Sequence, residues 1–268
     1  MKAKTILALS LPLAAMIIIT SLFGLLTPNF YSKETANWIA QSIGQDMVDL
    51  FLITPFLLIT TIFAVKKKRT AVMIWGGTNL YLLYTFIIYC FDLHFNKLFI
   101  IYCFTLGLSF YSFLYFLLSL VKENILVWFE SKRSFRFIGI YFLIIPLIFY
   151  FLWLSEILPA IINNETPKSL TETNLFTNPV HIIDLSVFLP GVFLTGILLL
   201  KRKNIALIMT PAILSFFILM DITIGTLIVV MKQKGLEVDY TVTIVMSFLA
   251  VFSTILLIIY LKSLKKQG

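Results

Sequence analysis

Eight stretches of about 20 apolar residues follow one another through this chain of 268 residues. A helix needs about 20 such residues to cross the hydrocarbon core of a bilayer, where only helices and closed barrels satisfy their backbone. The runs are continuous and do not alternate between apolar and polar residues, so they are predicted to be helices. Their approximate bounds are 5–27, 46–65, 71–91, 98–121, 137–160, 180–200, 205–231 and 240–261.

The composition excludes the main classes of soluble protein. Hydrophobic residues make up 60% of the chain and charged residues 13%, whereas ordinary soluble domains are about 45–50% apolar and about 25% charged. A soluble fold of this length cannot bury so much apolar surface, so a soluble enzyme, a nucleic-acid-binding domain and a disordered chain are excluded. The first run exceeds the apolar core of a signal peptide, about 7–15 residues, and is interpreted as a retained helix. We therefore expect an all-α membrane protein with eight transmembrane helices.

The basic residues indicate how the helices are oriented. With the N-terminus in the cytoplasm, 16 of the 21 Lys and Arg residues fall on the cytoplasmic side and 5 on the other side. Such an excess marks the cytoplasmic loops of membrane proteins, so both termini are predicted to be cytoplasmic. The net charge of +8 is thus an orientation signal and not a sign of nucleic-acid binding. The cytoplasmic loop at 122–136 fits either a short interfacial helix or a loop anchored by Trp128.

The second half of the chain repeats features of the first at a distance of 135 residues. The aligned pairs include Asp49 and Asp184, Pro55 and Pro190, Lys66 and Lys201, and Lys68 and Lys203. Such self-similarity predicts a duplication, with one four-helix repeat at 1–134 and a second at 135–268. Four spans return the chain to the same side, so the repeats are expected to be parallel. A pseudo-two-fold axis along the membrane normal would relate them, with a possible site at their interface.

Polar residues at the outer ends of the second and sixth spans occupy equivalent positions in the two repeats. They form the patterns Asp46-x-x-Asp49 and His181-x-x-Asp184, and a spacing of three places both members on one helix face. Asp221 lies well inside the seventh span, where a carboxylate is costly unless it faces a bundle interior or a watery cavity. Further polar residues are expected near the outer side. They are Asn79, Tyr81 and Tyr84 of the third span, Asp92 and His94 of the loop after it, and Trp153 and Glu156 of the fifth span.

Two interpretations of these carboxylates remain open. In the first, Asp49, Asp184 and Asp221 line an outward-facing cavity that binds a cation, a proton or a cationic ligand, and His181 joins a proton relay. In the second, Asp49 and Asp184 complement the positive ends of their helices, the sixth capped by Asn178, and Asp221 is a hydrogen-bonding link between helices.

Common catalytic and metal-binding motifs are missing from the sequence. It contains no phosphate-binding glycine-rich loop, no His-Glu-x-x-His and no Gly-x-Ser-x-Gly. We predict no catalytic residue, no cofactor and no metal site. Cys90 and Cys103 flank a short loop, where they form either a disulfide or two unpaired thiols.

Several stretches resemble a widespread group of bacterial multi-span membrane proteins that carries no assigned function. They are TNPVHIIDL at 177–185, LWLSEILPA at 152–160, the Gln45-Asp46 pair, YTF at 84–86 and FNKLF at 95–99. The resemblance extends from about residue 38 to 205. It implies a location in the bacterial cytoplasmic (inner) membrane and eight spans, and it supplies no activity.

Three functions fit the pattern. The first is a small ion-coupled secondary transporter with its site between the halves. The second is a sensor or accessory subunit that binds a ligand or a membrane partner protein through its outer loops. The third is a membrane enzyme that acts on a lipid-linked substrate, with outer carboxylates and His181 as acid and base. All three have the lipid bilayer as surroundings, and the first adds a small cation or proton as partner.

Overall fold

The computed structural model describes residues 1–130 and 134–265, and their regular structure is helical. The prediction of eight helices long and apolar enough to cross a membrane is confirmed for these residues. The spans are Ala3–Leu26, Ala36–Val65, Arg69–Phe91, Phe99–Leu120, Phe135–Asn163, Pro179–Leu200, Asn204–Gln233 and Tyr240–Lys262.

Two of the spans are built from three consecutive elements each. The second consists of α2 (Ala36–Val48), the π-helical segment η1 (Asp49–Ile53) and α3 (Thr54–Val65). The sixth consists of α8 (Pro179–Ile183), the π-helical segment η3 (Asp184–Phe188) and α9 (Leu189–Leu200). The remaining elements are α1 (Ala3–Leu26), α4 (Arg69–Phe91), α5 (Phe99–Leu120), the 3₁₀ turn η2 (Ile125–Trp128), α6 (Ser134–Asn163), α7 (Lys168–Thr173), α10 (Asn204–Gln233) and α11 (Tyr240–Lys262).

The predicted start of the second span, at residue 46, is wrong by ten residues. The helix begins at Ala36, where the hydroxyl of Thr35 accepts a hydrogen bond of 3.2 Å from the Trp38 amide. The added turns are too polar for a hydropathy scan, but they pack against α10. Asp49 therefore lies deep in the span. A helix dipole acts only within the first turn, so the interpretation of Asp49 as its complement is excluded.

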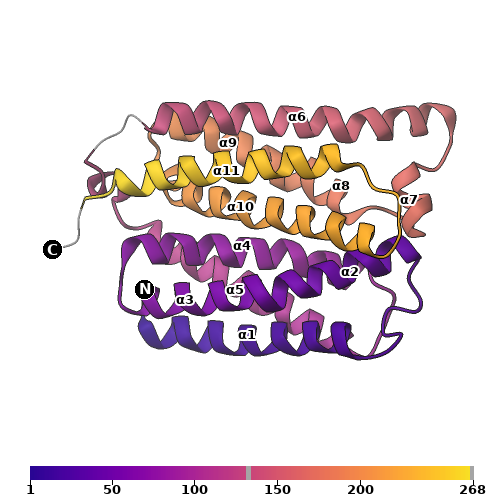
Figure 1. Cartoon of the computed structure of the whole chain (residues 1–268). Helices are drawn as coiled ribbons and strands as arrows, with labels where there is room; N and C mark the ends of the chain where they lie inside the picture. The colour runs from indigo at the N-terminus through magenta and orange to yellow at the C-terminus, as the bar shows by residue number, and fades with distance from the viewer. Residues whose placement is uncertain (131–133, 266–268) are drawn as a thin grey trace.

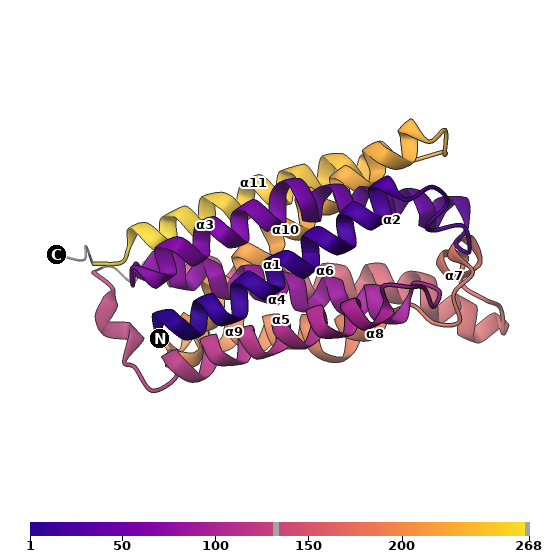
Figure 2. The same cartoon turned by 90° about the horizontal axis from the view of Figure 1, so that it is seen from below.

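The helices form two groups that meet along α4 and α10 (Figures 1 and 2). In one group, α1 packs on α3, α3 on α4 and α4 on α5; in the other, α6 packs on α9, α9 on α10 and α10 on α11. Contacts also cross between the groups, from α2 to α10 and from α8 to α4. The central position of α4 explains why 78% of its apolar window is buried, against 22% for the peripheral α11.

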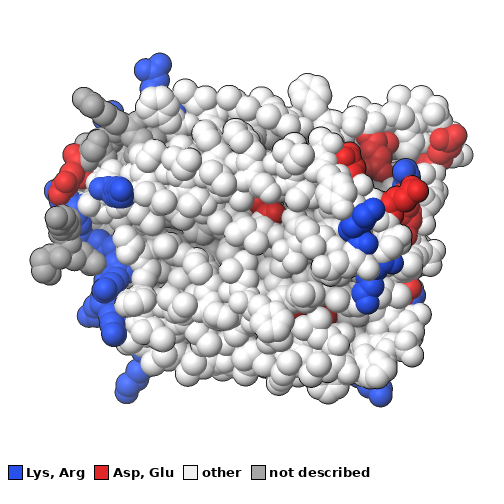
Figure 3. Space-filling model, viewed as in Figure 1, with Lys and Arg blue, Asp and Glu red and all other residues white. Residues whose placement is uncertain are grey.

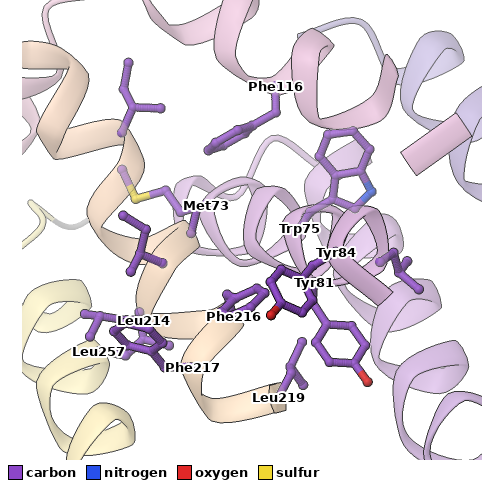
Figure 4. Close-up of a cluster of buried hydrophobic side chains, with 14 of the residues drawn as sticks. Met73, Trp75, Tyr81, Tyr84, Phe116, Leu214, Phe216, Phe217, Leu219 and Leu257 are labelled. Atoms are coloured by element: carbon purple, nitrogen blue, oxygen red, sulfur yellow. The ribbon is translucent and has the colours of Figure 1, made fainter. Parts of the chain in front are cut away.

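α4 and α10 pack in register at the same distance of 135 residues. A Cβ atom added to Gly77 would lie 2.8 Å from the Ala212 carbonyl oxygen and 2.4 Å from the Ser215 Cβ. One turn further, the rings of Tyr81 and Phe216 have centroids 6.4 Å apart. Figure 4 shows this region of buried aromatic side chains. At these two positions a residue on α4 thus meets the residue 135 positions later on α10.

The two ends of the bundle differ in charge. α1 begins and α11 ends at one end, which we name the basic end, together with the loops at 66–68, 121–130 and 201–203. Figure 3 shows Lys and Arg at the basic end with little acidic surface beside them, and a middle band that is almost uncharged. At the opposite end it shows further basic side chains together with most of the acidic atoms of this face. At the basic end, the Arg69 guanidinium stacks 4.7 Å from the centre of the Trp128 ring.

Candidate ligand cavity between the helix groups

A cavity of about 510 Å³ lies between the two groups of helices, in the half of the bundle away from the basic end. Side chains from α2, α4, α6, α7, α8, η3, α9, α10 and α11 line it. Its volume falls within the range of about 300–1,000 Å³ that small-molecule sites occupy. Five acidic side chains contribute to the lining. They are Asp92, Glu156, Glu172, Asp184 and Asp221.

Asp184 is held in the cavity wall by donors from two other helices. The oxygen Oδ1 accepts a hydrogen bond of 3.0 Å from the hydroxyl of Tyr84 on α4, and Oδ2 accepts one of 2.9 Å from the indole of Trp153 on α6. As predicted, Asn178 caps the helix, because its Oδ1 accepts from the amides of Val180 and His181. Both donors to the carboxylate are neutral, so its charge, when present, is not compensated by a cation.

Asp221 reaches the same cavity from α10 with fewer partners. It is buried, and its Oδ2 atom has no hydrogen-bond partner among the described residues. The interpretation of Asp221 as a hydrogen-bonded link between helices is therefore not supported by any bond in the described part of the chain. A buried acceptor without a donor is costly, and it is satisfied when a ligand, an ion or water supplies one.

Glu156 and His181 complete the predicted set that lies on the cavity. The His181 ring lies 4.5 Å from the Trp153 ring, centre to centre. Glu156 Oε1 accepts a hydrogen bond of 2.9 Å from the Ser169 amide, which fixes α7 beside the cavity. Both side chains thus lie beside the groups that hold Asp184.

Asp92 lines the cavity just after the end of α4, outside the spans. Neither carboxylate oxygen has a hydrogen-bond partner among the described residues. Burial, and secondly the nearby charge of Glu34, raise the pKa of Asp92 to about 8. Glu34 itself is bound by His94, whose amide and Nδ1 lie 2.8 and 2.9 Å from its carboxylate oxygens.

Three of the predicted site residues do not line the cavity. Asp46 is fully buried in its own group of helices, where the hydroxyls of Tyr31 and Tyr89 donate hydrogen bonds of 2.6 and 2.7 Å to it. Asn79 is also fully buried and donates to the Trp75 carbonyl of its own helix. The third, Asp49, is linked to the cavity indirectly.

A short hydrogen-bonded chain connects Asp49 to the cavity wall. The amide nitrogen of Gln45 donates to Asp49 Oδ1 at 3.0 Å and lies 2.9 Å from the Tyr81 hydroxyl. That hydroxyl is 2.8 Å from the Thr223 hydroxyl on α10. Gln45 and Thr223 both line the cavity. Asp49 therefore lies one side chain behind the wall.

Aromatic rings make up much of the remaining wall. They are Trp38, Tyr84, Tyr89, Tyr141, Phe149, Trp153, Phe188, Phe216 and Phe217. No Lys or Arg contributes to the lining in the part of the chain that the structure describes. A negative, aromatic wall favours a cation, because carboxylates supply charge and ring faces supply cation–π attraction.

Sequence reasoning did not select four of the residues that shape the cavity. Asp92, Gln45, Tyr84 and Trp153 were not among the predicted site residues. Asp92, Tyr84 and Trp153 were expected only among the polar residues near the outer side, where tyrosines and tryptophans usually anchor helices at the membrane surface. In the described residues no group of three or more His, Cys, Asp and Glu residues could hold a metal ion, and both cysteines are free.

Comparison with protein-family models, with curated proteins and with solved structures finds no match to this chain.

Proposed function

We propose that the protein is a small ion-coupled secondary transporter that binds an organic cation in the cavity between its two groups of helices. The observation that carries this proposal is the wall itself, which has five carboxylates, nine aromatic rings and no described Lys or Arg. A bare metal ion needs a compact cage of oxygen ligands, whereas this cavity offers room and apolar surface for an organic body. The buried Asp221 is the group on which substrate and proton would compete.

We further propose that the two groups of helices are the parallel repeats at 1–134 and 135–268. Both π-helical segments, α3 and α9, and the starts of α4 and α10 are offset by the same 135 residues. The helix contacts of one group have counterparts in the other, and α4 meets α10 in register. A pseudo-two-fold axis between α4 and α10 accounts for these relations, and the cavity then lies at the interface of the repeats, where transporters bind their substrates.

The proposed orientation places the basic end in the cytoplasm and the cavity on the outer side of a bacterial cytoplasmic membrane. Its support is the excess of Lys and Arg at one end of the bundle, and for the bacterial membrane the resemblance described above. In this orientation both termini are cytoplasmic. The negative cavity then faces the side from which a cation would enter the cell.

The test uses 1-methyl-4-phenylpyridinium, an aromatic cation with a fixed charge. Binding to the purified protein is measured by equilibrium dialysis, and uptake is measured in proteoliposomes under an imposed ion gradient, first of protons and then of Na⁺. We expect saturable binding and gradient-dependent uptake. Asp221→Asn should weaken binding at least tenfold, since about 1.4 kcal/mol of charge attraction corresponds to a factor of ten. Glu237→Gln, an exposed loop residue outside the cavity, is the matched control and should bind as the wild type does.

Absence of binding to the wild type, or equal binding to Asp221→Asn, would contradict the proposal.

A sensor is the second candidate function. The observation that favours it is how far the cavity extends towards the basic end. Its lining reaches Tyr141 and Phe216, and the tight contact at Gly77 lies beyond them on the side of the basic end. Saturable binding without uptake under any gradient would select the sensor over the transporter.

A further inference from the structure

The π-helical segment η1 leaves a backbone carbonyl without its usual donor. The amide of Thr54 bonds to the Asp49 carbonyl, five residues back, and the Thr54 hydroxyl bonds to the same oxygen at 2.8 Å. The Leu50 carbonyl would take its bond from Thr54 or from the next residue, Pro55. Thr54 is used elsewhere and proline has no N–H, so the helix supplies no donor to Leu50.

The equivalent carbonyl in the sixth span also lacks a helix donor, but a side chain of another helix replaces it. There the Leu189 amide bonds to the Asp184 carbonyl, and Pro190 follows, so Leu185 is left without a helix donor. The hydroxyl of Tyr150 on α6 donates to the Leu185 carbonyl at 2.6 Å. Asp184 is also satisfied at both oxygens. In the π-helical segment η3, side chains of the protein therefore donate to both the free carbonyl and the aspartate.

The segment η1 lacks a complete set of such side-chain donors among the described residues. Asp49 is completely buried, its Oδ2 atom has no hydrogen-bond partner among the described residues, and no described side chain bonds to the Leu50 carbonyl. Two further buried oxygens without partners, the hydroxyls of Thr20 and Ser21, lie on α1. α1 packs directly against η1.

These oxygens lie at one level of the bundle. The position of Asp46 is fixed against α1, because a Cβ atom added to Gly24 would overlap its carboxylate. α1 and α2 run in opposite directions, as Figure 1 shows. One turn back from Gly24 on α1 comes the pair Thr20 and Ser21, and one turn on from Asp46 on α2 comes Asp49. This register places Thr20 and Ser21 at the level of Asp49 along the bundle.

We propose that Asp49 Oδ2, the Leu50 carbonyl and the hydroxyls of Thr20 and Ser21 form a binding site for a dehydrated sodium ion. All four groups are hard oxygen ligands that lack a donor, and a cation satisfies them at once. The site itself holds one carboxylate, whose charge a monovalent ion cancels, whereas a divalent ion would leave a net positive charge at the site. Carbonyls freed where a transmembrane helix departs from α geometry are suited to this role.

This site rests on the proposed function, for which it supplies the coupling ion. Gln45 bonds to the other oxygen of Asp49, lines the organic-cation cavity and lies beside Tyr81. An ion on Oδ2 holds Asp49 ionised and in place, which fixes the amide of Gln45 in the cavity wall. Sodium binding and organic-cation binding are therefore coupled through one side chain.

The test measures binding of ²²Na⁺ to the purified full-length protein in detergent, together with thermal unfolding in NaCl against KCl at equal ionic strength. We expect saturable ²²Na⁺ binding and a higher Tm in NaCl. Asp49→Asn keeps the acceptor for Gln45 and Thr20→Val keeps its volume, so both should fold. Each should lower the affinity for ²²Na⁺ at least tenfold and remove the Tm difference.

Thr61→Val is the matched control. Thr61 is another buried hydroxyl without a partner, about 16 Å along the helix from Leu50, and its loss should leave sodium binding unchanged. Absence of ²²Na⁺ binding in the wild type, or unchanged binding in both site variants, would overturn the proposal. So would a stabilisation by low pH alone that Asp49→Asn removes, since the site would then hold a proton. No organic cation is present, so the result is independent of whether the cavity binds one.

Discussion

The carboxylates of this protein differ in what surrounds them more than in where the sequence places them. Asp184 receives hydrogen bonds from a phenol and an indole, and Asp46 from two phenols. Neutral donors stabilise a carboxylate without cancelling its charge. Asp221 and Asp92 have oxygens that no described residue satisfies. A ligand can therefore supply the missing hydrogen-bond or ion partner of Asp221 and Asp92, whereas Asp184 and Asp46 already have donors.

Asp92 gives a prediction for the pH dependence of stability. Its pKa in the folded protein is about 8, against about 3.9 for an unfolded aspartate. Between these values the folded state holds a proton that the unfolded chain has released, so stability is greatest at low pH and falls as the pH rises towards 8. The slope from this group is at most about 1.4 kcal/mol per pH unit. Asp92→Asn should remove it.

Thermal unfolding in detergent, followed at pH 6 and pH 8, measures this effect. The Tm of the wild type should fall more between the two pH values than that of Asp92→Asn. Every other titrating group is common to both proteins, so the difference isolates Asp92. Equal Tm changes in the two proteins would show that the carboxyl ionises without cost in the fold.

At this scale the sequence identified the unusual residues but not their surroundings. Asp184, Asp221, His181 and Glu156 could be predicted, because a charged or titratable group within or beside an apolar run is conspicuous. The failure for Asp46 has a physical reason, since two tyrosines distant in the chain enclose it. Which hydroxyl reaches which carboxylate depends on how helices pack, and no periodic pattern encodes that.

Among the elements, α4 and α10 hold the two groups of helices together. Gly77 permits the contact, since its Cα approaches the backbone of α10 so closely that no side chain fits. Small residues at such positions let membrane helices associate through backbone proximity, where no hydrophobic driving force acts.

Gly77→Ala should destabilise the protein by about 1–3 kcal/mol, the usual cost of overpacking. The added methyl would lie 2.8 Å from the Ala212 carbonyl, and a backbone atom cannot move aside as a flexible side chain does. Gly107→Ala on α5 is the control, because nothing lies within 4 Å of its added Cβ. Loss of the folded fraction after heating, measured by size-exclusion chromatography, compares the two variants. A Gly77→Ala protein as stable as Gly107→Ala would contradict this account of the interface.

The bounds of the elements were predictable where hydropathy defines them. Every span except the second agrees with its predicted bounds within three residues. The second span failed at its start because its first turns carry polar side chains, and it is helical there through the Thr35 cap and its packing on α10. The only sign of the π-helical segments that can be recognised in the sequence is a proline six residues after each aspartate.

For the whole molecule, the proposed orientation leads to a topology prediction. A fluorescent protein fused to the C-terminus should fluoresce, because it folds in the cytoplasm. Alkaline phosphatase inserted at Gly235, between α10 and α11, should be active, because it folds only outside. A dark C-terminal fusion together with inactive phosphatase would show the opposite orientation, with the cavity on the cytoplasmic side. The sequence carried the charge bias on which this prediction rests, whereas the cavity depends on helices that are far apart in the chain.

A π-helical segment also sets the rotational phase of the helix that follows it. Each segment accommodates one residue more than an α-helix would, and one residue corresponds to about 100° of rotation. α3 is thus turned relative to a straight continuation of α2, which lets α2 face α10 while α3 faces α1 and α4. Deleting one residue, such as the exposed Phe51, would restore an unbroken helix and turn its later half towards the wrong neighbouring helices. If the halves are copies, a single codon inserted in their common ancestor accounts for both segments.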